Sequence, residues 1–195
     1  MLYKVISLQC NTINDGFSIG YTELQNQAGK WEYSGFVKAG YAYPGDYKNK
    51  FENVQFMYLA DYMNLNNIFG KYLGEKVNEF IKQNNLDYRV QIIALKGYTV
   101  QNNEMQQTEI GNPGFVAAAT GINVITNFST IDSALGGKGD LLISAANDLL
   151  PGTDPEIQLA LLALLRWREE NSFLAEKTGA IRSSIGGAVW MGQEA

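Results

Sequence analysis

The stretch YKVISLQCNTINDGFSIGYTEL, residues 3–24, predicts two strands joined by a polar turn. Apolar and β-branched residues form near-continuous runs on both sides of the turn at residues 11–16, as buried strands do. After a tight turn at residues 28–30, residues 31–42 predict a third strand that is rich in Tyr, Phe and Val. Because the connections are short, we expect these strands to form an antiparallel meander.

The following hundred or so residues alternate between helical and strand patterns. Residues 63–84 carry apolar side chains at helical spacing, and residues 115–120 predict a short helix that Gly121 ends. Residues 90–95 and 124–126 are short apolar strands. The order β-β-β-α-β-α-β predicts an α/β fold, in which helices flank a mixed five-stranded sheet.

The last third of the sequence combines a glycine-rich loop with an apolar helix. The loop spans residues 134–140, and the helix is expected over residues 157–168. Thr153, Asp154, Pro155 and Glu156 match a capping box with proline at the first helical position. This pattern predicts where the last helix begins.

The composition excludes several classes of function. The 195 residues fit one domain, and the absence of histidine removes Ser-His-Asp catalysis, Cys-His catalysis and histidine-ligated zinc. Cys10 is the single cysteine and lies in an apolar strand, so we expect it to pack in the core and form no intrachain disulfide. The formal charge of −5, without a run of Lys or Arg, predicts no binding to nucleic acid.

The sequence also predicts a cytoplasmic chain that does not enter a membrane. Its first residues lead into a strand without the apolar segment and cleavage site of a signal peptide. The most apolar segment, residues 157–165, is too short to span a bilayer.

Two polar segments are candidates for chemistry. The turn at residues 11–16 has small polar residues whose amides can face a phosphate, with Asp15 to hold Mg²⁺ through water, but an Asn-Asp-Gly turn is also typical of an ordinary hairpin. The second segment, residues 127–139, follows the end of a strand, where α/β sheets bind ligands. Its glycines are equally consistent with a loop that needs positive φ angles.

In their order along the chain, these segments resemble the anhydro-N-acetylmuramic acid kinases, two-lobed sugar kinases of the actin, Hsp70 and hexokinase superfamily. The resemblance rests on residues 5–21, 120–128, 134–139, 164–170, 178–182 and 186–188. It implies a single RNase H-like, actin-like lobe over residues 1–195. Residues 1–150 would form its N-terminal part, and residues 151–195 its returning helix and tail. The activity implied is ATP-dependent phosphorylation of an anhydro amino sugar in peptidoglycan recycling.

The resemblance also implies roles for individual residues. Thr12, Asn14, Asp15 and Gly16 stand in the family's phosphate-binding hairpin, where Asp15 would be the metal ligand beside Mg-ATP. Asn127 stands at the position of the family's catalytic base. The positions implied for the substrate are Lys96, Gly97, Asp132, Gly136, Gly137 and Gly139.

Three departures from the family pattern affect the expected activity. The hairpin has Asn11 where the family has glycine, and the family's Asp-Phe-Arg is Asn127-Phe128-Ser129 here. Where the family has Ser-His-Gly, this chain has Leu95-Lys96-Gly97. Because an amide cannot accept the proton that a carboxylate accepts, we expect the base to be lost and no cofactor to be used by this chain alone.

The family's second, nucleotide-binding lobe has no counterpart in this sequence, which passes from Leu150 to Pro151 and the last helix. The resemblance therefore predicts a chain that is inactive alone and acts as a binding or regulatory partner. The partner would be a second copy or a full-length kinase, and an anhydro amino sugar is the expected ligand.

Two alternatives remain open. One is an active kinase that another chain completes, with Asp132 as the base. The other is a sugar-binding module that uses the aromatic strand at residues 31–43 and Lys96, although such aromatic residues more commonly pack in the core of a sheet.

Overall fold

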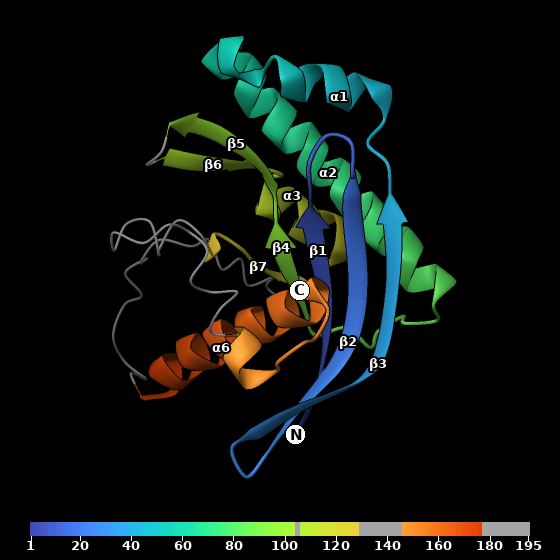
Figure 1. The fold of residues 1–195 in the computed structure, drawn as a ribbon, viewed down its shortest axis with the longest axis vertical. Helices are drawn as coiled ribbons and strands as arrows, with labels where there is room; N and C mark the ends of the chain where they lie inside the picture. Colours follow the sequence, from blue (N-terminus) through green and yellow to red (C-terminus); the bar gives the residue numbers. More distant parts are fainter. Residues whose placement is uncertain (104–105, 129–145, 177–195) are drawn as a thin grey trace.

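The computed structural model describes residues 1–103, 106–128 and 146–176. Its centre is a five-stranded sheet with the order β3-β2-β1-β4-β7 (Figure 1). The strands are β1 (Leu2–Cys10), β2 (Phe17–Gln27), β3 (Lys30–Tyr41), β4 (Ile92–Lys96) and β7 (Asn123–Ile125). The first three form an antiparallel meander, and β4 and β7 run parallel to β1. The predicted α/β fold with a mixed five-stranded sheet is confirmed.

Helices cover both faces of this sheet (Figure 1). On one face lies α2 (Leu59–Gln83), with α3 (Pro113–Thr120) packed against it. On the other face lies α6 (Pro155–Glu176), which contacts β1, β2 and β4. The strand sequences fit this arrangement, because alternate residues point to opposite faces. In β1, for example, Ile6 and Leu8 pack toward α2, whereas Val5 packs toward α6.

Helix α2 is longer than the sequence indicates, and it is preceded by elements that the sequence did not predict. These are α1 (Gly45–Glu52) and a short 3-10 helix, η1 (Val54–Phe56). Pro44 precedes α1 as its N-cap, and Phe51 is the residue that α1 buries. A proline followed by a largely polar helix gives no apolar stripe, so the segment reads as a turn in sequence.

A second small sheet was also missed. Strands β5 (Tyr98–Asn103) and β6 (Gln106–Ile110) pair as an antiparallel hairpin directly after β4. Residues 101–109 are almost entirely polar, so they lack the alternation that predicts a strand. Gly97 allows the hairpin to fold back, because a Cβ atom at this residue would lie 2.6 Å from the Ile110 carbonyl oxygen.

Helix α6 begins at Pro155, as predicted, but its cap differs from the predicted capping box. Asp154 is the N-cap: its Oδ1 accepts a hydrogen bond from the Glu156 amide at 3.2 Å. The Thr153 hydroxyl instead donates to the Leu150 carbonyl at 2.9 Å. Within the described residues, no helix combines the length and apolar character that a bilayer crossing needs.

Candidate functional site

The three parallel strands β1, β4 and β7 end at the same edge of the main sheet (Figure 1). In the register of the sheet, Gln9 lies opposite Lys96, and Asn127 follows two residues after the pair of Ala94 and Ile125. Adjacent strands are about 4.8 Å apart, so Gln9 and Lys96 lie side by side, and Asn127, just past the end of β7, continues this row of polar residues along the edge. The structure thus brings together three segments that the sequence implicates, and the carboxyl edge of a parallel sheet is where such folds bind ligands.

The turn at residues 11–16 lies beside this row and is closed by its own hydrogen bonds. The amides of Asp15 and Gly16 donate to the Thr12 carbonyl at 3.1 and 3.0 Å, and the Asn11 amide donates to the Gly16 carbonyl at 2.9 Å. The Thr12 hydroxyl donates to the Asp15 carboxylate at 2.5 Å. Gly16 is required here, since its φ is +75° and a Cβ atom would lie 2.0 Å from the Tyr41 carbonyl oxygen.

By itself, this turn does not offer the groups that would hold the phosphates of Mg-ATP. Three of its six amides, the Thr12 hydroxyl and the Asp15 carboxylate already have partners within the turn. The turn contains no Lys or Arg to offset phosphate charge. Among the described residues, no three His, Cys, Asp or Glu side chains gather as a metal centre requires. The metal-binding role of Asp15 therefore stays a prediction.

Asn127 follows β7 and holds an unusual backbone conformation. Its φ is +62°, in the left-handed region that asparagine adopts more readily than most residues. The neighbours fix this position: Phe128 is buried, and the Thr126 carbonyl accepts a hydrogen bond from Arg166 Nη1 at 2.8 Å. The half-buried Asn127 side chain can donate and accept hydrogen bonds, but it cannot take up a proton near neutral pH.

Glu109, which the sequence did not single out, also reaches this edge. It lies near the end of β6, and its Oε2 accepts a hydrogen bond from the Gly97 amide at 3.1 Å. Burial raises the pKa of the Glu109 carboxyl, while the Gly97 hydrogen bond and the nearby charge of Lys96 oppose the rise. No sequence pattern pointed to this residue, because the hairpin that carries it was not predicted.

Cys10 is the last residue of β1 at this edge. It is buried, as predicted, and burial raises the pKa of its thiol to about 12. The Tyr43 hydroxyl, next to it, donates to the Asn11 carbonyl at 3.1 Å. A thiol with this pKa stays protonated at neutral pH, so Cys10 acts in packing and not as a nucleophile.

Three aromatic residues of the strand considered as a sugar platform are used in packing, whereas Tyr33 is 46% exposed. Trp31 is buried against the side of the sheet that α6 covers, and Tyr43 is buried on the other. Tyr41 stacks on Phe17 with ring centroids 5.1 Å apart. These side chains are therefore not available as a flat surface for a sugar ring.

The remaining predicted substrate residues follow Phe128 in the sequence. Asp132, Gly136, Gly137 and Gly139 lie outside the described residues, as does Ser129. Their roles stay predictions from the sequence.

A second polar cluster, also missed from sequence, lies on the face of the sheet that α6 covers, under the start of that helix. Glu156 is 3% exposed, and its carboxylate accepts hydrogen bonds from Ser18 Oγ at 2.5 Å and from Lys38 Nζ at 2.8 Å. Although partial burial opposes it, the hydrogen bonds to Glu156 and Asp154 raise the pKa of Lys38. Every charge in this cluster has a partner, so it joins α6 to the sheet.

Comparisons with known proteins point to one family. A family profile described as "Anhydro-N-acetylmuramic acid kinase" matches residues 3–164. A protein of that name from Shewanella pealeana is 40% identical over 87 residues, which cover 42% of this chain and 23% of that protein. A second, from Sulfurimonas denitrificans, is 25% identical over 156 residues, covering 74% of this chain and 40% of that protein. The chain thus matches well under half of the length of these relatives.

Proposed function

The chain belongs to the anhydro-N-acetylmuramic acid kinase family, and on that premise we propose that it binds an anhydro amino sugar without phosphorylating it by itself. The binding site is the carboxyl edge of the sheet, where the turn at residues 11–16 meets the ends of β4 and β7. The observation that carries this proposal is the amide side chain of Asn127 in the row with Gln9 and Lys96. This row offers hydrogen-bonding groups to a hydroxylated ligand, but no carboxylate at the position of the family's base.

Loss of turnover follows from how phosphoryl transfer works. The reaction depends on positioning the nucleotide and on stabilising charge from several sides at once. Replacing a general base by an amide costs a factor of about 10²–10⁴ in rate. The internally bonded turn at residues 11–16 adds to this loss, because its threonine hydroxyl and its aspartate are bonded to each other.

We further propose that the chain is a single lobe, with the second lobe of the family missing between residues 150 and 151. Support comes from the packing of α6, which follows that junction closely. Its apolar residues, with Ala146 and Leu150, share one buried cluster with β1, β2 and β4. A helix that completes the core in this way is consistent with a lobe that folds as one unit.

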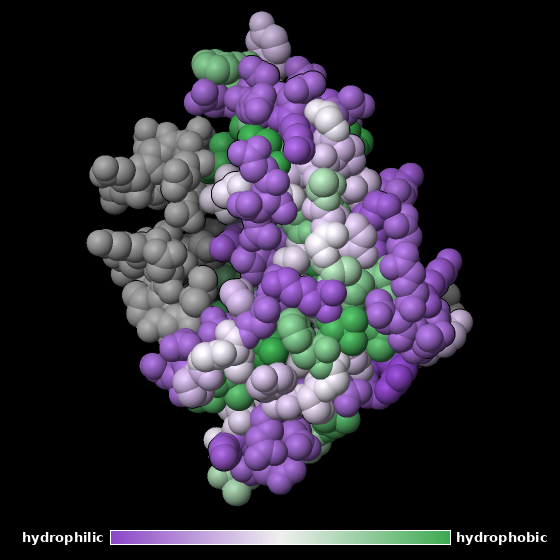
Figure 2. Space-filling model, turned by 45° about the vertical axis from the view of Figure 1, so that its right-hand side comes forward, coloured by the Kyte–Doolittle hydropathy of each residue, from purple (hydrophilic) through white to green (hydrophobic). Residues whose placement is uncertain are grey.

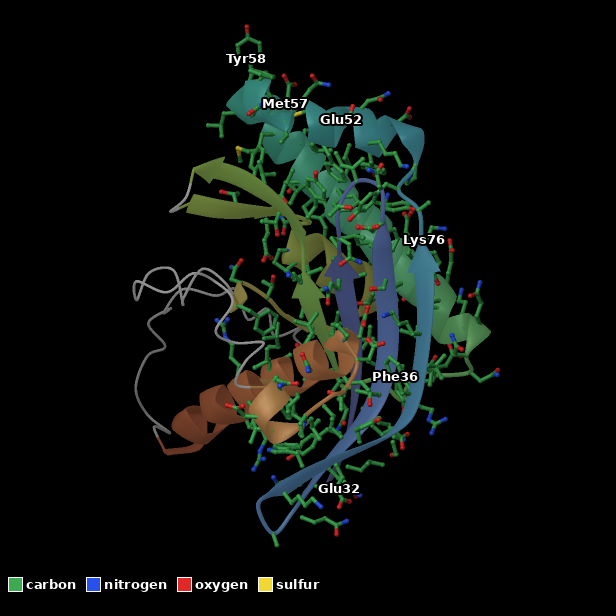
Figure 3. All side chains as sticks on the ribbon, viewed as in Figure 1. Glu32, Phe36, Glu52, Met57, Tyr58 and Lys76 are labelled. Atoms are coloured by element: carbon green, nitrogen blue, oxygen red, sulfur yellow. The ribbon has the colours of Figure 1, made fainter. Side chains whose placement is uncertain are left out.

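A partner is expected to cover an exposed apolar patch at the start of α2, formed by Phe56, Tyr58, Leu59 and Met63. These side chains are 77, 83, 73 and 56% exposed, and Tyr58 points away from the molecule (Figure 3). Exposed apolar groups of this size commonly mark interaction surfaces. The proposed partner is a second copy or a full-length kinase of the family. Size-exclusion chromatography that gives a monomer at micromolar concentration would contradict self-association.

The proposal is tested with purified protein and 1,6-anhydro-N-acetylmuramic acid. In a coupled assay with Mg-ATP we expect no sugar-dependent ADP release above the blank. In a thermal unfolding assay we expect the same sugar to raise the midpoint, because a ligand of the folded state stabilises it by mass action. ADP release by the chain alone would overturn the proposed inactivity, and an unchanged midpoint at millimolar sugar would overturn the proposed binding.

One observation favours the second candidate function, a kinase completed by another chain. Glu109 brings a carboxylate to the edge that lacks one at residue 127. In the same assay, a full-length family kinase whose own base has been replaced serves as the candidate partner. Sugar-dependent ADP release that appears only when both chains are present would support this function.

A further inference from the structure

Lys96 and Glu109 place opposite charges beside each other at the carboxyl edge without forming an ion pair. Lys96 ends β4, and Glu109 is bonded to the amide of the next residue, Gly97. Both side chains are half-buried. Within the described part of the chain, neither of them has an ion-pair partner within 4 Å. Because Lys96 and Glu109 do not pair with each other, both charged groups remain available to bind a ligand.

The contact that Glu109 makes does not require a charge. Its one hydrogen bond to the described part of the chain is accepted from a backbone amide, and a glutamine side chain would accept the same bond. Burial of the carboxylate opposes its ionisation, as the raised pKa of Glu109 reflects. A charge that costs stability without improving the fold is typical of residues that serve a ligand.

The position of Glu109 fits contact with the same ligand as the row at the sheet edge. Its Oε2 lies 3.1 Å from the Gly97 nitrogen, and Gly97 follows Lys96, the middle residue of the row. Gln9 pairs with Lys96 in the register of β1 and β4, and Asn127 follows the end of β7, the strand on the other side of β4. The Glu109 carboxylate is therefore held at the edge of the sheet where these polar residues stand.

We propose that Glu109, in place of residue 127, is the carboxylate of this site and accepts a hydrogen bond from a hydroxyl group of an anhydro amino sugar. This inference rests on the sugar binding proposed above. Lys96 and Asn127 complete the polar contacts on either side. The Gly97 amide holds the carboxylate in position, because it occupies one lone pair of Oε2; within the described residues Oε1 accepts no hydrogen bond, so it can face the ligand.

The test is isothermal titration calorimetry with 1,6-anhydro-N-acetylmuramic acid on the full chain. Glu109→Gln preserves shape and the bond to Gly97, so we expect the variant to fold and to bind the sugar about 10- to 100-fold more weakly, the usual loss for a charge-assisted hydrogen bond. Glu75→Gln is the matched control, since Glu75 is exposed on α2 and pairs only with Lys71. We expect the control to bind as the wild-type chain does.

A pH series separates a ligand contact from a structural role. The charged and titratable groups that face Glu109 are Lys96 on β4 and Cys10 on β1, and the Cys10 thiol, whose pKa burial raises to about 12, stays protonated between pH 5 and 7. Wild-type affinity should therefore fall as the pH is lowered from 7 to 5, whereas the affinity of Glu109→Gln should stay flat.

Each outcome has a distinct meaning. If the wild-type chain and Glu109→Gln bind the sugar equally, the role of Glu109 is wrong while the proposed sugar binding stands. If the wild-type chain binds no sugar, the proposed function fails and this inference fails with it. Weaker binding by the variant with the loss of the pH dependence supports the assignment.

Discussion

Glu109 and Glu156 are both glutamates withdrawn from water, but Glu109 lies at the carboxyl edge of the main sheet whereas Glu156 lies under α6, and they differ in their partners. Glu156 is bonded to Ser18 and Lys38, and it lies in the first turn of α6, where the helix dipole favours a negative charge. Glu109 accepts one hydrogen bond from a backbone amide and has no ion pair within the described residues. A buried carboxylate whose acceptor sites are all paired stabilises the fold. A buried carboxylate with unpaired acceptor sites is available to bind a ligand.

The largest effect is expected at the fully paired glutamate. Glu156→Gln removes the charge that Lys38 and Ser18 face, and we expect the free energy of unfolding to fall by about 2–3 kcal/mol, less than for a fully buried pair because Lys38 is partly exposed. Urea denaturation at pH 7 measures the change. Glu75→Gln, the exposed control, should change stability by less than about 0.5 kcal/mol. Equal effects of the two substitutions would erase the distinction between the two kinds of glutamate.

A smaller loss is expected where α6 approaches the sheet. A Cβ atom at Gly20 would lie 2.8 Å from Ser7 Oγ and 2.9 Å from Glu156 Cβ. Gly20→Ala should therefore push α6 away and cost about 1–3 kcal/mol in unfolding free energy. Gly40→Ala on the neighbouring strand is the control, since nothing lies within 4 Å of its added Cβ. A neutral Gly20→Ala would mean that the Glu156 cluster does not depend on this close approach.

The N-cap of α6 contributes about 1 kcal/mol. Asp154→Ala removes the hydrogen bond to the Glu156 amide and one partner of Lys38, and a lost cap costs about 0.5–2 kcal/mol. Thr153→Ala removes only the bond to the Leu150 carbonyl and should cost less. Thermal unfolding of the two variants ranks them, and a greater loss for Thr153→Ala would restore the capping box expected from sequence.

The smallest effect, with the opposite sign, is expected at Glu109. Because its pKa is raised in the folded chain, the stability that Glu109 contributes is present below the unfolded-state pKa and is lost as the pH rises through the folded-state value. At pH 7, Glu109→Gln should therefore unfold at equal or higher urea concentration than the wild-type chain, by less than about 1 kcal/mol. The advantage of the variant should disappear toward pH 4. A clear loss of stability at pH 7 would place Glu109 with Glu156 as a structural residue.

Much of the sheet was predictable because its signals are local. The runs of apolar residues before and after the turn at residues 11–16 identify β1 and β2, and the turn residues fix how they pair. The polar hairpin β5–β6 and the helix α1 were missed because neither has an apolar pattern of its own. Both are held by contacts with the rest of the chain, which periodicity does not record.

Of the candidate site, the sequence identified the segments that meet at the sheet edge, and the family resemblance singled out Asn127 and Lys96 within them. It did not identify Glu109, whose place depends on the unpredicted hairpin folding over Gly97. Figure 2 shows many hydrophilic residues on one face of the molecule. The sequence contains no signal that distinguishes a solvated carboxylate from one withdrawn into a site.

The sequence by itself determined the order of the main-sheet strands along the chain, the helices α2, α3 and α6, and the residues that β1, β2 and β4 bury, because these follow from the spacing of apolar side chains along a short stretch of chain. Only the tertiary structure decided the environment of the two glutamates. Glu156 meets Ser18 across 138 residues of sequence, and Glu109 meets Gly97 through a hairpin. Contacts of this kind arise from packing between elements. The paired carboxylate of Glu156 and the carboxylate of Glu109, which has no ion pair within the described residues, therefore become distinct only once the chain is folded.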